Sequence, residues 1–409
     1  MSPLEPPRID PLPPGVLIPS QVIRGERIRQ PSAEEQHVTQ GQQWQAIFAK
    51  QDSEGFDKTR PIALTKENAR VNVPWGDILS EKSSSYTRLH VSNVNGIPLD
   101  TLCKLHIEIQ ADLFCWQEHN LDTTQLAVRS ILYDTARQYW PRNCMVFGTT
   151  PITFHTRYKF GGTFILSTGN LSGRVVKQTR DTMGRWVVQE LIGSQGRKIA
   201  IVSAYQPVDK TIIPGTTTVA AQQHSLLVQA QDAIIQPRQA FRRDLLAMLQ
   251  NLRQAQCELL LVLGDFNEAF GSDPEGMSKI AGQLGLVDIM ASRHSSPLPT
   301  TFTPGIKCCL DYGLATQHVC DALQHARYEA FNARVHSDHR GYFMDFDTKH
   351  LFGTDNPDLV SPSKRGLRSN NIHQVTAYIK KKYALLLAHN AFERMVILQK
   401  SGDRHAFAE

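Results

Sequence analysis

The stretch LVLGDFNEAF at residues 261–270 limits the possible folds more than any other part of the chain. Its apolar run is typical of a strand that is buried on both faces, which requires a sheet covered by further layers. The run ends in Gly264 and then presents Asp265 and Asn267. Layered α/β sheets hold polar side chains at rigid strand ends, where sites are built. The sequence therefore predicts an α/β domain with a site at one sheet edge.

Strand and helix patterns alternate along the middle of the chain. Strands are predicted in TRLHVSN, DLFCWQE, GGTFILS, RVVKQ, RWVVQELIG and RKIAIVSAYQP, and a Ser-Gln-Gly hairpin turn joins the last two. Short strands are expected at 309–314 and 342–346, and helices at 98–109 and 275–285. A longer helix begins near Pro237, with an apolar stripe formed by Phe241, Leu245, Leu249 and Leu252.

The two ends of the chain differ from this middle. Residues 1–85 are rich in Pro, Gln, Ser and Glu without a sustained apolar period, which predicts a disordered arm. Residues 86–348 carry the strand and helix patterns of one domain. Residues 349–409 combine a basic linker with an amphipathic helix marked by Ile372, Val375, Ile379, Tyr383 and Leu386. The polar end without a helix terminator favours a fragment of a longer chain.

Charge and cysteine content restrict the class of protein. The formal net charge is +5, and residues 349–409 carry all of it, with ten Lys or Arg against five Asp or Glu. A basic tail suits an acidic partner such as nucleic acid, but a solvated helix face explains it equally well. No apolar run reaches the roughly 18 residues of a membrane span, and the seven cysteines lack metal-ligand spacing. We therefore expect an intracellular protein, with the nucleus as one candidate compartment, and neither membrane, zinc nor disulfides.

Carboxylates close several apolar runs besides the one that ends at Asp265. Polar residues also lie at the ends of HVSNVNG, LFCWQEH, VSAYQP, PTTF, CLDYGL and HSDHRGYF. Carboxylates without Cys or clustered His suit a hard cation such as Mg²⁺ or Mn²⁺, and Glu118 and Asp338 are the best candidates. Such a cation polarises a phosphoryl oxygen.

The remaining polar residues match the other needs of phosphate-ester cleavage. A His oriented by a carboxylate, as His339 is by Asp311, serves as an acid–base pair or clamps a transition state. Asp265 then activates or aims the attacking water. Neutral donors bind phosphate oxygens without adding repulsion between anions, and these are Asn93, Asn267, Thr301 and Tyr205.

Each motif alone also has a purely structural interpretation. GDFN is compatible with an Asx-type turn, QE with a surface carboxylate, LDYG with an ordinary turn and SDH with a solvated loop. Tyr205 and Thr301 are ordinary residues for the edge of a core. The ordered set is much less expected by chance.

That ordered set, SNVNG, WQEH, AYQP, LGDFNE, TTF, LDYGL and SDHR, resembles the endonuclease/exonuclease/phosphatase superfamily over residues 86–348. This superfamily includes pancreatic deoxyribonuclease, abasic-site endonucleases, sphingomyelinases, inositol polyphosphate phosphatases and the endonucleases of LINE-type retrotransposons. The resemblance implies a deoxyribonuclease-like four-layer sandwich, in which two β-sheets lie between helices and the active site lies at one edge.

The resemblance also implies a role for each matching residue. Glu118 looks like the principal Mg²⁺ ligand, with Asn93 beside it and Asp338 as a further carboxylate on the metal side. Asp265 resembles the residue that aligns or deprotonates the water. The other matches are Asn267 on the phosphate, His339 as the catalytic histidine with Asp311 as its partner, Tyr205 as the transition-state tyrosine, and Thr301 and Ser337 near the phosphate.

Departures from the family pattern indicate which branch of the superfamily this chain resembles most. Inositol phosphatases carry a Trp-containing block before GD-x-N and a Pro-x-x-Cys-Asp-Arg block, whereas this chain has LVLGDFNEAF and KCCLDYGLAT. Arg340 follows SDH, where many members have Pro or an apolar residue soon after. SNVNG and SDHR resemble the retroelement endonucleases most, in which a reverse transcriptase follows in the same polyprotein.

The sequence is therefore compatible with three functions. We predict a Mg²⁺-dependent DNA endonuclease that leaves a 3′-hydroxyl and a 5′-phosphate. The alternatives are a phosphatase or phosphodiesterase for a small or lipid phosphate, and an inactive nucleic-acid-binding module. Candidate DNA contacts are the 215–223 loop and the 174–185 hairpin, for which solvated surface charge is the competing explanation.

Overall fold

The computed structural model describes residues 72–78, 81–96, 109–152, 158–208, 212, 217–294, 300–301, 309–357 and 372–401. Most of the predicted arm and nearly all of the predicted helix at 98–109 lie outside these residues. In the described part of the chain, no helix is long and apolar enough to cross a membrane.

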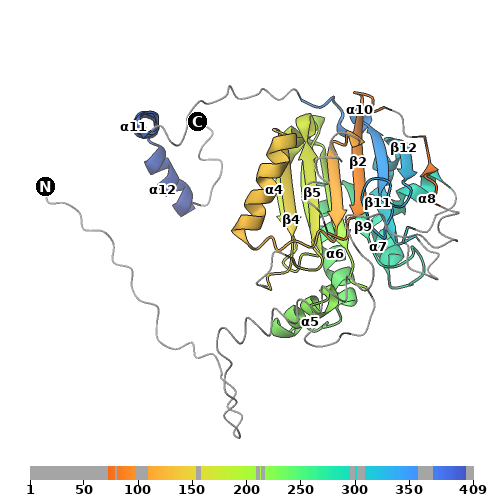
Figure 1. Ribbon diagram of the computed structural model, residues 1–409. Coiled ribbons are helices and arrows are strands. Elements are labelled where there is room, and N and C mark those ends of the chain that lie inside the picture. The colour runs from red at the N-terminus through yellow and green to blue at the C-terminus, as the bar shows by residue number, and fades with distance from the viewer. Residues whose placement is uncertain are drawn as a thin grey trace, which may run out of the picture. The chain divides into compact units, whose positions relative to one another are not determined.

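Two β-sheets pack face to face in this domain (Figure 1). One contains, in spatial order, β1 (Trp75–Gly76), β12 (Leu323–Tyr328), β13 (Tyr342–Asp347), β2 (Tyr86–Asn93), β3 (Leu113–Gln117), β5 (Thr163–Thr168) and β4 (Asn143–Gly148). The other contains β10 (Leu286–Asp288), β11 (Asp311–Thr316), β9 (Leu259–Asp265), β8 (Lys198–Tyr205), β7 (Trp186–Ile192) and β6 (Val175–Arg180).

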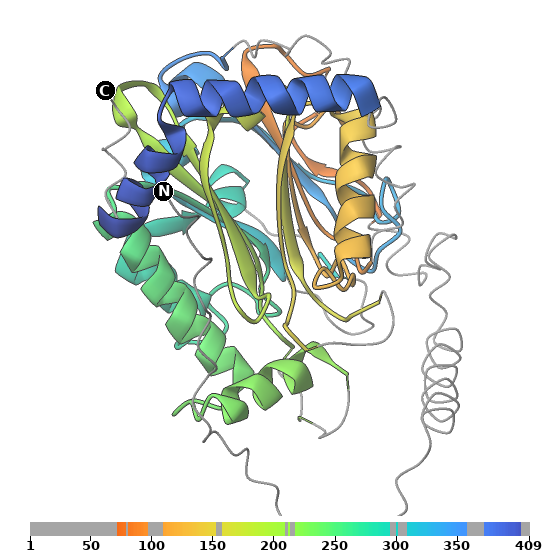
Figure 2. The ribbon, with the colours of Figure 1, turned by 90° about the vertical axis from the view of Figure 1, so that its left-hand side faces the viewer.

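Helices cover the outer faces of both sheets. Figure 2 shows α4 (Leu126–Tyr139) outside the seven-stranded sheet and α6 (Pro237–Gln254) outside the six-stranded one. The predicted four-layer α/β sandwich is thus confirmed. The described residues also form the α-helices α5 (Val219–Gln229), α7 (Met277–Leu284), α8 (Ile289–Arg293), α9 (Gln317–Asp321), α10 (Thr348–Phe352), α11 (Ile372–Ala388) and α12 (Ala391–Ser401).

Strand β9 explains the apolar run that precedes Asp265. Leu261 and Leu263 pack in the core between the two sheets, whereas Leu260 and Val262 pack in the core beneath α6. Both faces are buried, so the strand is apolar at every position before Gly264. A side chain on Gly264 would meet the carbonyl oxygen of Ala204 on β8, because a Cβ there would lie 1.9 Å from it.

The amphipathic stripe predicted for α6 is confirmed. Its four apolar residues, Phe241, Leu245, Leu249 and Leu252, are all buried against the six-stranded sheet. Burial of such side chains contributes about 1.5–3 kcal/mol each relative to exposure, so the helix depends on this face for its stability. Pro237 lies in the first turn, as predicted.

Strand register brings the predicted site residues to one edge. β2 is parallel to β3, and β8 is parallel to β9, so the residues that end these strands adjoin. β11 and β13 run antiparallel to their neighbours, and Asp311 pairs with Asp265. Asp311 therefore begins its strand and does not end it, which corrects the expectation that this carboxylate closes an apolar run.

The packed domain extends past both predicted boundaries. Upstream of residue 86, Trp75 in β1 pairs with Tyr328 in β12. Downstream of residue 348, α10 follows β13, and the buried guanidinium of Arg174 donates to the carbonyl oxygens of Thr354 and Asp355. These additions are short pieces that contribute only a few core side chains, Trp75, Leu351 and Phe352, so they leave no apolar period in the sequence.

The predicted amphipathic helix near the C-terminus corresponds to α11, and a second helix, α12, follows it. The two helices contact each other through the rings of Tyr383 and Phe392, whose centroids lie 5.8 Å apart.

Candidate active site

His339 lies between two aspartates at the common edge of the sheets. Its Nδ1–H donates to Asp311 Oδ2 at 2.8 Å, and its Nε2 lies 3.8 Å from Asp265 Oδ2. The side chain of His339 is only 10% exposed. Burial by itself lowers the pKa of His339, but the charges of Asp311 and Asp265 outweigh it and raise that pKa well above its ordinary value. The two flanking aspartates therefore favour the protonated form of the ring.

Asp265 is surrounded by an excess of negative charge. Burial, together with the nearby carboxylates of Asp311 and Glu118, raises the pKa of Asp265 to about 8. His339 offsets part of this charge. The cluster therefore has room for additional positive charge, because buried carboxylates outnumber the one imidazolium that faces them.

Glu118 is connected to Asp265 through neutral donors. Asn93 Nδ2 donates to Glu118 Oε2 at 2.8 Å and to Asp265 Oδ2 at 2.9 Å. Tyr205 donates its hydroxyl to Glu118 Oε1 at 2.6 Å. Burial and the charges of Glu118 and Asp265 raise the pKa of Tyr205 well above its usual value, so this phenol remains a proton donor.

Two asparagines without an assigned role connect Asp338 to this group. The backbone N–H of Asn95 donates to Asn93 Oδ1 at 3.0 Å, and Asn95 Nδ2 donates to Asp338 Oδ1 at 3.2 Å. Asn120 Nδ2 donates to Asn95 Oδ1 at 3.3 Å. Asn95 lies within the SNVNG motif, and Asn120 directly follows WQEH. Their position in or beside these motifs is the sequence signal that could have indicated a role in the site.

Four residues of this cluster have left-handed backbone conformations. Their φ angles are 41° at Asn95, 50° at Glu118, 54° at Asn120 and 48° at Asn267. Such angles are uncommon for residues other than glycine, and they concentrate at sites where the surrounding structure holds the strain. Glu118 is the clearest case, because Glu lacks the short polar side chain that makes this conformation easier for Asn.

The three residues predicted to bind substrate lie in this same region. Asn267 donates its backbone N–H to Asp265 Oδ1 at 2.9 Å and its side-chain Nδ2 to the Gln206 carbonyl at 2.8 Å. Ser337 Oγ donates to the Asn93 carbonyl at 2.7 Å. Thr301 forms a backbone bridge with His339.

Thr300, one position before the predicted Thr301, supports Asp311. Its hydroxyl oxygen accepts from the backbone N–H groups of Leu310 at 2.9 Å and Asp311 at 3.0 Å. The PTTF motif predicts Thr301, because the motif alone does not indicate which of its two threonines supports Asp311.

Glu268 was also missed, although it follows GDFN directly. Its carboxylate is buried and accepts from Gln206 Nε2 at 2.9 Å, from Arg238 Nη2 at 2.9 Å and from Arg242. It also accepts from the backbone N–H of Met277, which begins α7. This residue therefore ties the loop that carries Asn267 to α6 and α7.

The donor set fits a hard divalent cation. Glu118 and Asp338 offer carboxylate oxygens, which Mg²⁺ and Mn²⁺ prefer. Asn93 presents Nδ2 to Glu118, and its amide oxygen accepts the N–H of Asn95. Each carboxylate oxygen of Glu118 accepts one hydrogen bond and keeps a further lone pair. Asp265, Asp311 and His339 also place ligand atoms within 4.8 Å of one another, but the proton of His339 already bridges that group.

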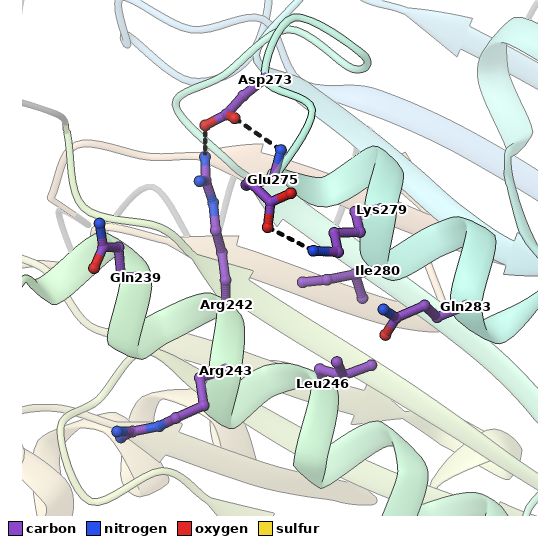
Figure 3. A pocket seen from close by; sticks show the side chains of 9 residues that line it. All are labelled: Gln239, Arg242, Arg243, Leu246, Asp273, Glu275, Lys279, Ile280 and Gln283. Carbon is purple, nitrogen blue, oxygen red and sulfur yellow. Dashed lines mark hydrogen bonds and ion pairs between the residues drawn. The ribbon is translucent and has the colours of Figure 1, made fainter. Parts of the chain in front are cut away.

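A separate cleft of about 500 Å³ lies between α6 and α7 (Figure 3). Its charged side chains neutralise one another, because Arg242 reaches Asp273 at 2.7 Å and Lys279 pairs with Glu275. None of the predicted site residues lines this cleft.

Several residues of the two predicted DNA-contact segments are buried, whereas Lys177 and Arg180 in the 174–185 hairpin are exposed, so DNA contact by these segments stays a prediction. Arg185 is buried in ion pairs with Asp181 and Asp244, and Arg174 is buried against backbone carbonyls. In the 215–223 segment, α5 begins at residue 219, and Gln222 and Gln223 are buried. Burial follows from partners distant in sequence, which local charge patterns do not reveal.

The family model of the Endonuclease/Exonuclease/phosphatase family matches residues 91–326, more than half of the 409 residues. The chain therefore belongs to this family. Its members are hydrolases that act on phosphodiester bonds and in general depend on divalent metal ions.

Solved structures with a similar fold include two AP endonucleases and a 3′ phosphatase. An AP endonuclease from Leishmania major has a TM-score of 0.47 and 15% identity, with 70% of this chain and 96% of that chain covered. A 3′ phosphatase from Neisseria bound to product DNA hairpin gives 0.43 and 16%, covering 64% and 99%. An AP endonuclease from Archaeoglobus fulgidus gives 0.44 and 14%, covering 64% and 99%. A sequence search of curated proteins found no match.

Proposed function

We propose that this protein is a Mg²⁺-dependent endonuclease that hydrolyses phosphodiester bonds of DNA. The observation that carries the proposal is the position of the His339 ring between Asp311 and Asp265. Phosphodiester hydrolysis needs a carboxylate that can take a proton from water and a positive group for the charge that develops on the phosphate. Membership in the Endonuclease/Exonuclease/phosphatase family supports this reaction class.

Each site residue has a defined part in this proposal. Asp265 aims the attacking water and takes its proton, and a pKa of about 8 suits a base that works near neutral pH. His339 stabilises the negative charge on the phosphoryl oxygens, with Asp311 fixing its ring. Attack breaks the bond between phosphorus and O3′, so a 5′-phosphate and a 3′-hydroxyl result. Neutral contacts to the phosphate come from Asn267, Tyr205, Thr301 and Ser337.

A divalent cation would be held by the carboxylates of Glu118 and Asp338, with Asn93 beside them. When bound, Mg²⁺ polarises the phosphoryl oxygen and offsets its charge, and Mn²⁺ suits the same ligands. The buried negative charge that raises the pKa of Asp265 supports a cation in this region.

A retroelement origin is the finer part of the proposal. SNVNG and SDHR resemble the endonucleases of LINE-type retrotransposons, in which a reverse transcriptase lies in the same polyprotein. The run Lys380–Lys381–Lys382 on α11 is exposed, which suits an acidic partner such as nucleic acid. Cleavage of chromosomal DNA would place the enzyme inside the cell, in the nucleus where one is present.

Substrate choice and the salt dependence of binding distinguish the proposed nuclease from the competing phosphatase. We expect Mg²⁺-dependent cleavage of plasmid DNA whose binding weakens steeply between 50 and 200 mM salt, because duplex binding releases counterions. Cleavage of a small phosphate ester such as p-nitrophenyl phosphate, with a shallow salt dependence and intact plasmid, would favour the phosphatase. DNA binding without either activity would favour the inactive module.

A further inference from the structure

Arg340, the residue that departs from the family pattern after SDH, is a buried cation directly beside His339. Its side chain is only 1% exposed. One guanidinium nitrogen, Nη1, lies 2.9 Å from the carbonyl oxygens of both Val73 and Glu329. The guanidinium carbon lies 4.3 Å from the centre of the Phe331 ring. Arg340 thus connects the His339 loop to the end of β12 and to a segment far upstream in the sequence.

The upstream segment is itself fixed to the same place. Asn72 accepts the backbone N–H of Phe331 on its side-chain oxygen at 2.6 Å and donates Nδ2 to the Phe331 carbonyl at 3.4 Å. Trp75 pairs with Tyr328 in β12. Residues 72–76 are therefore part of the structure that holds Arg340, although the sequence places them in the predicted arm.

A second connection runs from the backbone of Arg340 to Asp311. The N–H of Arg340 donates to the Thr300 carbonyl at 2.8 Å, and the Thr300 hydroxyl accepts the Asp311 N–H at 3.0 Å. Asp311 in turn receives the Nδ1–H of His339. The backbone and side chain of Arg340 therefore restrain both members of the His339–Asp311 pair.

We propose that Arg340 is a positioning residue that fixes His339 against Asp311 by anchoring its loop to residues 72–73 and to the end of β12. Arg340 touches neither substrate nor reacting atoms in this arrangement. Its effect on turnover rests on the proposed nuclease function, whereas its effect on the His339 ring does not.

The test compares Arg340→Met with a matched control in the full chain. The control is Arg174→Met, because Arg174 is also buried, donates to backbone carbonyls and lies 4.4 Å from a ring centre, that of Phe352. One readout is the low-field imidazole N–H proton signal of His339, assigned by its loss in His339→Ala. The other is kcat and KM for plasmid nicking.

We expect Arg340→Met to broaden or remove the His339 signal and to lower kcat about 10- to 100-fold, while KM changes much less, because small misplacements of catalytic groups act on the reaction step. Arg174→Met should leave both readouts unchanged. Arg340→Lys should lose less than Arg340→Met, because Lys keeps the positive charge. It should not match the unaltered chain, because an ammonium lacks the planar fork of a guanidinium. A folded Arg340→Met with an unchanged His339 signal and kcat would overturn the proposal.

Should Arg340→Met fail to fold, Asn72→Ala decides the question, because it loosens the upstream anchor without removing a buried charge. A weakened His339 signal in Asn72→Ala supports the proposal, and an unaltered signal overturns it. If the unchanged chain cuts no DNA, the signal still tests Arg340, and only the proposed function fails.

Discussion

His339 donates to Asp311 over 2.8 Å, and this hydrogen bond joins the two sheets of the sandwich. Asp311 begins β11 in the six-stranded sheet, and His339 lies in the loop that leads into β13 in the seven-stranded sheet. Two further bonds cross the same seam, from Asn93 to Asp265 and from Tyr205 to Glu118. The geometry of the site therefore depends on how the two sheets pack.

Removing the charge of Asp311 should impair catalysis without unfolding the chain. Asp311→Asn keeps the shape of the side chain but withdraws the carboxylate that stabilises the imidazolium of His339. We expect kcat to fall about 10²- to 10⁴-fold, the range typical of general acid–base groups. Single-turnover nicking rates provide the measurement. Asp134→Asn is the control, since the side chain of Asp134 is 78% exposed on α4; equal rates for the two variants would contradict the assignment.

Divalent-metal affinity should depend on Glu118 and on the hydroxyl that supports it. Glu118→Gln should abolish measurable Mn²⁺ binding in calorimetry. Tyr205→Phe should weaken it about 10- to 100-fold, because loss of a group that orients a ligand costs this much in known metal sites. Tyr342→Phe is the control, since it removes a buried hydroxyl that donates to a backbone carbonyl at 2.9 Å. Unchanged Mn²⁺ affinity in Glu118→Gln would place the metal elsewhere.

Stability of the metal-free protein should fall as the pH rises. The pKa of Asp265 is raised from an ordinary 3.8 to about 8, so the folded state holds a proton that the unfolded state releases between these values. The raised pKa of His339 has the same sign: its stabilisation is complete below the unfolded pKa and is lost as the pH rises through the folded pKa.

Urea unfolding in EDTA at pH 5 to 9 measures this dependence. Asp265→Asn should flatten the decline, because it removes one of the two groups that hold the extra protons. Stability that rises over this range in the unaltered chain would show that the buried cluster titrates in the opposite sense.

Asp122 and Lys159 form an ion pair of 2.7 Å in which both side chains are fully buried. The pair lies beside the loop of Glu118, because the backbone N–H of Lys159 donates to the carbonyl of Asn120 at 3.0 Å and the backbone N–H of Asn120 donates to the carbonyl of Gly161 at 2.9 Å. Asp122→Asn leaves the ammonium of Lys159 without its counter-charge and should cost about 3–5 kcal/mol of unfolding free energy. Glu275→Gln breaks an exposed pair with Lys279 and should cost less than about 1 kcal/mol. Denaturant melts that give equal losses would refute this ranking.

The sequence was sufficient for the layers and for the edge at which the site forms. The apolar run of β9 predicted a doubly covered strand, and the stripe of Phe241, Leu245, Leu249 and Leu252 predicted a covering helix, because both patterns reflect burial directly. All ten predicted site residues lie in the same region, as the motif order suggested. Their chemical roles remain predictions.

Residues held by long-range contacts were not predictable in this way. The local sequence pattern indicates exposed cations at Arg174 and Arg185, because the partners that bury them lie elsewhere in the chain. Residues 72–76 read as part of an arm because a two-residue strand has no period. Thr300, Glu268 and Arg340 act through hydrogen bonds to distant loops, so neither spacing nor propensity marks them.

The most direct test of the central claim is nicking of supercoiled plasmid by the purified chain, with Mg²⁺, with EDTA, and with His339→Ala in Mg²⁺. We predict nicked circles with Mg²⁺ alone, ends that carry a 3′-hydroxyl and a 5′-phosphate, and a rate reduced by at least about 10²-fold in His339→Ala. Nicking that persists in EDTA, or that His339→Ala leaves unchanged, would contradict the claim that this edge cluster is the active site.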